Sequence, residues 1–519
     1  MKNKKGFTLI ELLAVIIILA VIALIATPIV LNVVDNARKS ANKDSAYGLL
    51  DSAKLYYMES LLDESKSLSG NLIDKINVSG RKPDSGTVYI NDKGEIALSV
   101  VYDKVCFTKN YEDADLTESD DIENCNIPSL PSEPISKLYK DTVLNGADPE
   151  LKDNLVAVTI NNDGTVKKAD IYSEWYNYTN KTWANAVLLN SNDTYSAGDT
   201  IIEDAIKAYY VWIPRYRYQI FYDGVNATTK QLINITFESK DTTKSNGTTK
   251  DSWLTHPAFT FGDDELNGIW VGKFELTGNT TNPTIKPNVE SLRNANVSTL
   301  FTTTQKLSEN SSMLKNSEWG AIAYLTTSIY GQGLNEVRIN NSSTSTTGCA
   351  ASVENGPKYS GCENKYNTTT GYLASTTGNI SGIYDMSGGS YEYVMGVMED
   401  SLNSNTPSSG YSTQYNSGFS GKNLNDGTTT TGVLFPESKY YDIYKYGISK
   451  SDLTRYNIGD ATTETKGWNG DYTEFVYSSH PWFERGGNSG FGTSAGVFAF
   501  SYDNGGRDVN VNSARAILR

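Results

Sequence analysis

The residues with the clearest chemical potential lie at the start of the chain. Three lysines precede Gly6, and Glu11 is the only charged residue in the apolar segment 7–34 that follows. The peptidase that removes a secretory leader cuts at a small residue after the apolar region, whereas Gly6 stands before it. Cleavage after Gly6 would therefore keep the apolar segment on the mature chain and create a new amino group at Phe7. That amino group is the expected partner of the Glu11 carboxylate, within one helix or in a neighbouring subunit.

A long helix is needed to position these groups. As a helix, residues 7–34 extend about 40 Å, which exceeds the ~30 Å hydrocarbon core of a bilayer. A carboxylate inside that core costs about 2.5–3.5 kcal/mol, so Glu11 needs a partner. Apolar residues continue at three- and four-residue spacing as far as Tyr57, which predicts a helix over residues 7–62.

The N-terminal motif is Gly6-Phe7-Thr8-Leu9-Ile10-Glu11. It resembles the prepilin signature of type IV pilins and of type II secretion pseudopilins. The resemblance implies that residues 1–6 are a leader, that a prepilin peptidase cuts after Gly6 and methylates Phe7, and that Glu11 guides filament assembly. It also implies two kinds of partner, other pilin subunits and an inner-membrane assembly platform. The chain is then expected to cross the cytoplasmic membrane once before assembly, and to lie in an extracellular filament at the cell surface afterwards.

Residues 63–127 are expected to form a small pilin-like β domain. Strands are predicted at 87–90 and 95–102, separated by an Asn-Asp-Lys-Gly turn signal, and a further strand is predicted at 105–107. The acidic stretch 112–123 is interpreted as a solvated loop, with calcium capture as the alternative.

A change of composition follows this domain. Residues 128–137 form a proline-spaced linker, which favours an extended chain. Residues 138–205 are expected to be a β-rich connecting module, because an Asn-Asn-Asp-Gly turn signal separates predicted strands at 155–160 and 165–171.

Composition excludes one class of partner and indicates a location. The net charge is −15 and the pI about 4.8, which argues against nucleic acid because a phosphate-binding surface must be basic. Tyrosine is frequent, at 34 residues, and only 20% of the chain is charged, which is typical of extracellular β-rich proteins with long polar loops.

The four cysteines form two local pairs. Outside the membrane, Cys106 should bond to Cys125, and Cys349 to Cys362, each contributing roughly 3 kcal/mol for loops of this size. Free thiols are the alternative. Neither pair has the spacing of a zinc site.

Five segments beyond residue 206 recur together in one family. They are 268–277, 316–325, 382–393, 485–487 and 514–519. In this order they resemble the formylglycine-generating-enzyme and sulfatase-modifying-factor domain, a variant of the C-type lectin fold, over residues 206–519. The whole chain is therefore expected to be α+β, with a long transmembrane helix, a small antiparallel sheet and a large loop-rich, C-type-lectin-like domain.

The resemblance does not extend to the enzyme's chemistry. That oxidase binds copper with a pair of cysteines late in the domain, and no cysteine follows Cys362 here. His256 and His480 each precede a proline, and the sequence holds no G-x-S-x-G motif. We therefore expect no catalytic residues and no enzymatic activity.

Calcium is the one cofactor that the resemblance leaves open. The family binds structural calcium near segment 387–392, where Gly389 replaces the usual Asn, so Glu392 and Ser390 remain as candidate ligands. The sequence Trp-Asn-Gly-Asp at 468–471 resembles a lectin Trp-Asn-Asp element, with a simple turn as the favoured alternative.

The leading functional hypothesis is a minor or tip pilin-like subunit of a type IV pilus or related filament. Its large extracellular domain would serve adhesion or bind a glycan or protein ligand, and its size favours a minor or tip position. Two alternatives stay open. One is a pseudopilin that selects cargo for a type II secretion-like system, and the other is an enzyme displayed on the surface.

Overall fold

The structure of the protein is a computed structural model. It describes residues 9–519 apart from 62–65, 67, 69–70, 79, 92–93, 112, 124, 126–137, 153, 223, 226–228, 248–250, 355–360, 399–416, 423–428, 445–458, 478–479 and 503–504. The chain divides into two compact units, Met1–Lys137 and Leu138–Arg519. The predicted linker at 128–137 lies outside the described residues.

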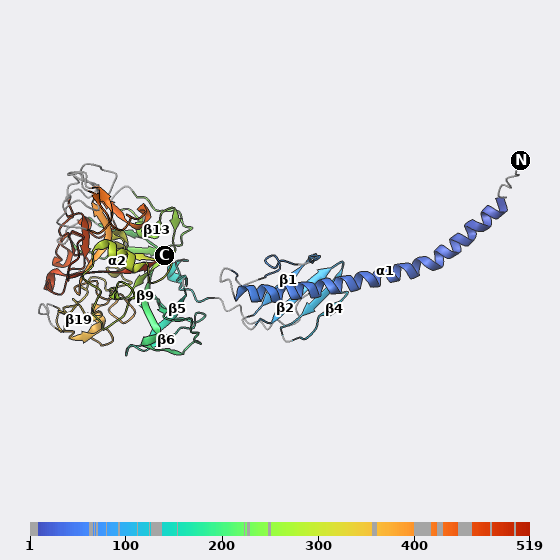
Figure 1. Ribbon diagram of the computed structural model, residues 1–519, viewed down its shortest axis with the longest axis horizontal. Helices are drawn as coiled ribbons and strands as arrows, with labels where there is room; N and C mark the ends of the chain where they lie inside the picture. The colour runs from blue at the N-terminus through green and yellow to red at the C-terminus, as the bar shows by residue number, and fades with distance from the viewer. Residues whose placement is uncertain are drawn as a thin grey trace. The chain divides into compact units, whose positions relative to one another are not determined.

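The N-terminal unit combines one long helix with one small sheet (Figure 1). Helix α1 (Leu9–Ser60) is followed by β1 (Ser85–Ile90), β2 (Ile96–Tyr102), β3 (Val105–Lys109) and β4 (Thr117–Ser119), which pair in sequence order as antiparallel neighbours. The three predicted strands of this domain are confirmed. The turn between β1 and β2 is short because Gly94 ends it with a φ of +78°, a backbone conformation that residues with an L side chain rarely adopt.

The C-terminal half of α1 packs on this sheet (Figure 1). Ala46, Leu49, Leu50 and Ala53 recur at three- and four-residue spacing and are buried together with apolar residues of β1, β2 and β3 such as Leu98. The N-terminal half of α1 extends beyond the sheet (Figure 1).

The C-terminal unit is built on an eight-stranded antiparallel sheet. In spatial order its strands are β18 (Ser311–Met313), β28 (Ala516–Leu518), β15 (Gly268–Gly272), β9 (Ile206–Pro214), β7 (Asn185–Leu189), β5 (Leu155–Ile160), β6 (Val166–Lys168) and β8 (Thr200–Ile201). The last strand of the chain, β28, thus lies one strand in from an edge of this sheet, between β18 and β15.

A second sheet holds the other long strand of this unit. Its order is β24 (Asp442–Tyr444), β21 (Tyr391–Met398), β25 (Trp482–Arg485) and β26 (Phe500–Ser501), and β27 (Asn512–Ala514) also pairs with β21. Helices α2 (Val297–Thr304) and α3 (Asn316–Thr326) complete the core, and every residue of α3 is buried.

The remaining strands form small ribbons. They are β10 (Tyr216–Gln219) with β11 (Asn234–Phe237) and β12 (Leu254–Thr255), β13 (Thr260–Phe261) with β14 (Asp264–Glu265), β16 (Thr277–Gly278) with β17 (Pro283–Thr284), β19 (Cys349–Ala350) with β20 (Asn364–Lys365), and β22 (Gly421–Lys422) with β23 (Thr429–Thr430). Aromatic residues fill the space between these elements, with Trp183, Trp319, Trp468 and Trp482 fully buried.

The expected boundary at residue 205 falls inside the eight-stranded sheet. β9 pairs with β7 on one side, as at Val211 and Asn185, and with β15 on the other, as at Val211 and Val271. Residues 138–205 therefore supply strands to the same sheet as the rest of Leu138–Arg519 and are not a separate module. The α+β class is confirmed, whereas the C-type-lectin-like architecture is not.

Candidate functional site

The residues predicted to be processed lie at the edge of the described chain. Gly6 and Phe7 are outside the described residues. Glu11 lies in the first turns of α1, and its side chain is outside the described part. Cleavage at Gly6, methylation of Phe7 and docking through Glu11 accordingly stay predictions.

The N-terminal half of α1 exposes many large apolar side chains. Leu9 and Leu24 are the most exposed of them, and Leu13, Val15, Ile16, Ile17, Ile18, Leu19, Val21, Ile22, Val30, Val33 and Val34 are exposed as well. A continuous apolar surface of this kind marks an interaction site in a folded protein. As far as the structure describes the helices, none is both long enough and apolar enough to cross a membrane, so the predicted single span is not confirmed.

Both predicted disulfides are present. Cys106 in β3 bonds to Cys125, with an S–S distance of 2.05 Å and a Cα–Cα distance of 5.6 Å. The Ser99 hydroxyl donates to the carbonyl of Cys125 at 2.7 Å, which ties the segment after β4 to β2. This disulfide closes a loop that contains the whole acidic stretch 112–123, within which β4 lies.

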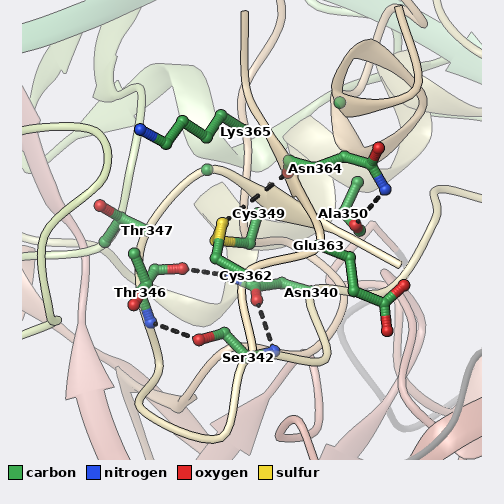
Figure 2. The surroundings of a disulfide bond; sticks show 12 residues. Asn340, Ser342, Thr346, Thr347, Cys349, Ala350, Cys362, Glu363, Asn364 and Lys365 are labelled. Carbon is green, nitrogen blue, oxygen red and sulfur yellow. Dashed lines mark hydrogen bonds between the residues drawn. A yellow bond between two sulfur atoms is a disulfide. The ribbon is translucent and has the colours of Figure 1, made fainter. Parts of the chain in front are cut away.

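The second disulfide joins Cys349 in β19 to Cys362, just before β20 (Figure 2). The side chain of Asn340 organises the loop beside it (Figure 2). Its amide donates to the carbonyl of Thr346 at 2.8 Å, and its oxygen accepts from the backbone N–H of Ser342 at 3.0 Å. The disulfide therefore braces a loop that already has its own polar framework.

The two candidate calcium ligands are engaged by other protein groups. Glu392 forms an ion pair with Arg515, and both side chains are fully buried. Arg515 Nε donates to Glu392 Oε2 at 3.0 Å, and its Nη2 donates to Oε1. The Ser390 hydroxyl shares a 2.7 Å hydrogen bond with that of Ser291. An internal cation thus already neutralises the Glu392 carboxylate.

A second carboxyl, that of Glu275, lies near the Glu392–Arg515 pair. Glu275 Oε1 accepts from the backbone N–H of Ser390 at 2.8 Å, while Glu275 Oε2 has no hydrogen-bond partner among the described residues. Burial, together with the neighbouring Asp385 and Glu392, raises the pKa of Glu275 well above its ordinary 4.5. Burial therefore favours the protonated, neutral form of Glu275.

Asp385 completes this buried network. Its carboxylate accepts from the amide of Asn340 at 2.8 Å and from the backbone N–H of Gly348 at 2.9 Å. Across the described chain, no three Asp, Glu, His or Cys side chains come together as a metal site would require. Calcium at Glu392 and Ser390 stays a prediction, and this geometry does not favour it.

A second polar network surrounds Arg485. Its guanidinium donates to Asn316 Oδ1 at 2.9 Å and to the carbonyl of Ala461 at 2.8 Å, and it lies over the ring of Trp319. Tyr444 donates to the buried carboxylate of Asp460 at 2.6 Å. These bonds fix segment 459–465 against α3, which is a structural role.

The lectin-like tetrapeptide at 468–471 is a turn. Asn469 has a φ of +60° and Gly470 a φ of +81°, and the Trp468 ring packs against Phe498. The buried Asp471 carboxylate accepts from the backbone N–H of Phe498 at 2.9 Å. The turn interpretation of this segment is therefore supported.

The described part of the C-terminal unit includes three surface pockets large enough to hold several water molecules. One of about 190 Å³ contains Glu336, whose pKa burial raises to about 7, and Arg338. Another of about 360 Å³ lies at Tyr472 and Glu474. The third, of about 250 Å³, lies beside β5 and includes Trp175.

The comparisons with known proteins concern the start of the chain. Residues 1–27 match the model of the prokaryotic N-terminal methylation motif. The protein therefore has a type IV pilin- or pseudopilin-type N-terminus, which implies processing by a prepilin peptidase and assembly with pilin subunits. No curated protein matches the chain. The comparisons give no support to the resemblance of residues 206–519 to the sulfatase-modifying-factor domain.

Several buried ionisable residues were not identified from the sequence. Lys273, Glu275 and Asp385 lie in the segments that resemble the sulfatase-modifying-factor domain. The sequence did not indicate that these three side chains are buried in polar networks. The available signal was Lys273-Phe274-Glu275, where charges alternate with an aromatic residue directly after an apolar run. The pocket beside β5 had no sequence signal, because its walls come from separate segments.

Proposed function

We propose that the protein is a minor or tip subunit of a type IV pilus or a related filament, and that its C-terminal unit is displayed outside the cell for adhesion. One observation carries the proposal. A prokaryotic N-terminal methylation motif opens a chain whose first unit is a long helix packed on a small antiparallel sheet, and a separate large unit follows.

The physical properties of α1 support the first half of this proposal. Its N-terminal half is apolar and exposed, while its C-terminal half is covered by its own sheet. An exposed apolar helix surface needs a lipid or protein environment. Packing against the same helix of other subunits supplies one, and the methylated terminus of a neighbour supplies a cation for Glu11.

The size of the second unit supports the minor or tip position. A unit of residues 138–519 on every subunit would crowd a filament, whereas one copy at a tip meets no such limit. Long polar loops on a rigid scaffold are also where binding sites commonly lie.

Fractionation of the producing cells tests this proposal. We expect shearing to release the mature chain together with the filaments, in smaller amounts than the main pilin, and deletion of the prepilin peptidase to return it to the membrane fraction. A chain that stays cell-bound in wild-type cells, while a secreted protein is lost when its gene is deleted, would contradict display and favour the pseudopilin alternative.

A further inference from the structure

The pocket beside β5 has a volume of about 250 Å³. Its walls come from three segments that are distant in the sequence: β5 with the turn after it, the segment 175–185 that leads into β7, and the loop 379–381. Sites for drug-sized ligands occupy roughly 300–1,000 Å³, so this pocket suits a single small ring rather than an extended chain.

None of the described residues that line this pocket is charged. The chain as a whole carries a net charge of −15, so an uncharged pocket is not a consequence of its composition. Taking an ion out of water without a counter-charge is costly. The lining side chains therefore offer no counter-charge to an ionic ligand, which favours an uncharged one.

The walls combine apolar faces with free polar groups. Trp175, only 8% exposed, and the aliphatic side chain of Ile160 supply the apolar faces. The side chains of Thr159, Asn162 and Thr182 make no hydrogen bond to any described residue, and hydroxyl and amide groups can both donate and accept. A sugar ring matches this pattern, because it presents C–H groups on its faces and hydroxyls around its edge.

The back of the pocket is held rigidly. The Asn379 amide donates to the carbonyl of Lys181 at 2.9 Å, and the Ser381 hydroxyl donates to the same carbonyl at 3.1 Å. The backbone N–H of Trp183 donates to the Ser381 hydroxyl at 2.9 Å. The Asn185 amide donates to the Ser381 carbonyl, also at 2.9 Å. The loop 379–381 is thereby fastened to the segment that faces it across the pocket.

A buried lysine reinforces this wall from behind. Lys273 is fully buried, and its Nζ donates to Asn185 Oδ1 at 2.9 Å and to the carbonyls of Ile380 and Gly382 at 2.6 and 2.8 Å. One buried amine thus contacts three acceptors, and all three belong to the pocket wall or adjoin it. A site that is already ordered loses less entropy when its ligand binds.

We propose that this pocket binds one uncharged sugar residue of a glycan, without calcium. The sugar stacks on Trp175, and its hydroxyls bond to Asn162 and Thr182 at the rim. The inference rests on the proposed function, because displaying the C-terminal unit outside the cell is what brings it to such a glycan.

A glycan array probed with the full chain in detergent tests the proposal. The array carries oligosaccharides that end in neutral hexoses or N-acetylhexosamines, and others that end in sialic acid or sulfated sugars. The variants are Trp175→Ala, Asn162→Ala and Thr182→Val. The matched control is Tyr172→Ala, because Tyr172 is 53% exposed, lies three positions from Trp175 and does not line the pocket.

We expect binding to neutral-ended glycans that a chelator leaves unchanged. Trp175→Ala should weaken it at least tenfold, Asn162→Ala and Thr182→Val several-fold, and Tyr172→Ala not at all. Binding only to acidic glycans, no binding, loss of binding with the chelator, or equal binding by all variants would overturn the proposal. If Trp175→Ala does not fold, the two rim variants decide, because each alters only an exposed side chain.

The same preparations separate this proposal from the broader one. A chain that enters sheared filaments but binds no neutral glycan leaves display intact and refutes the sugar pocket. A chain that binds neutral glycans through these residues but never enters filaments refutes the filament role and leaves the pocket intact.

Discussion

Arg515 and Glu392 form an ion pair that is fully shielded from solvent. Arg515 stands between β27, which belongs to the five-stranded sheet, and β28, which belongs to the eight-stranded sheet. Its guanidinium also donates to the carbonyl of Gly272 at the end of β15, at 2.7 Å. The pair therefore holds the two sheets together at the point where the chain passes from one to the other.

Glu392→Gln should lower the free energy of unfolding by about 3–5 kcal/mol, because it removes the charge of the carboxylate to which the buried Arg515 guanidinium donates. Urea unfolding of the full chain in detergent measures this change. The control is Glu437→Gln, which breaks the exposed pair with Lys439 and should cost less than about 1 kcal/mol. Equal losses in the free energy of unfolding for the two substitutions would show that the buried pair stabilises the fold no more than the exposed pair does.

Glu275→Gln should change how stability depends on pH. The folded state holds a proton on Glu275 at pH values where the unfolded state has released it, because the pKa of Glu275 is raised well above 4.5 by burial and by its carboxyl neighbours. The unfolded state then binds fewer protons, so stability falls as the pH rises above 4.5 until the folded pKa is reached.

The glutamine stays neutral and removes this loss. We expect the melting temperatures of the parent and Glu275→Gln chains to agree near pH 4 and to separate above it, with the variant the more stable at pH 7. A constant difference across this range would mean that Glu275 does not titrate as its burial indicates.

The Cys349–Cys362 disulfide should stabilise the C-terminal unit. Replacing both cysteines by serine opens a loop with a sequence separation of 13 and should cost roughly 3 kcal/mol. Peptide mapping without reduction should also recover Cys349 with Cys362 and Cys106 with Cys125. Cross-linked pairs between the two units, or four free thiols, would contradict the structure.

Glu11→Ala should reduce entry into filaments while leaving the membrane level and cleavage unchanged. The substitution removes a carboxylate that is costly in the membrane, so insertion should not suffer. It also removes the group that fixes register against a neighbour's amino terminus. Quantifying the chain in sheared filaments and in membranes measures the effect.

Asp44→Ala is the matched control for this measurement. Asp44 is an exposed carboxylate of the same helix, outside the apolar segment, and its removal should leave filament entry as in the parent. If Glu11→Ala enters filaments as well as Asp44→Ala does, the docking role of Glu11 is wrong.

Local features of this fold could be predicted from the sequence. The turn at 161–164 closes with Gly164 at a φ of +89°, and the backbone N–H of Gly164 donates to the carbonyl of Asn161 at 2.8 Å. Such turns depend on residues that are adjacent in the chain. The two disulfides were predictable for the same reason, because each closes a short loop.

Long-range pairing could not be predicted in this way. β28 pairs with β15 across more than two hundred residues, and no local pattern in 516–518 specifies that partner. The domain boundary expected at residue 205 does not match the sheet for this reason. The aromatic segment that forms β9 suggested the start of a domain, whereas β9 pairs with β7 from before that boundary. The pocket beside β5 could not be predicted either, because Ser381 and Trp183 are distant in the sequence and come into contact only in the folded chain.

The central claim is that the chain is processed and used as a pilin-type subunit, and mass spectrometry of the mature N-terminus tests it most directly. We predict that the protein recovered from cells begins at Phe7 and carries one methyl group on its amino nitrogen, and that Gly6→Val keeps the leader attached. A mature chain that retains residues 1–6, or one that begins after residue 26, would contradict this account.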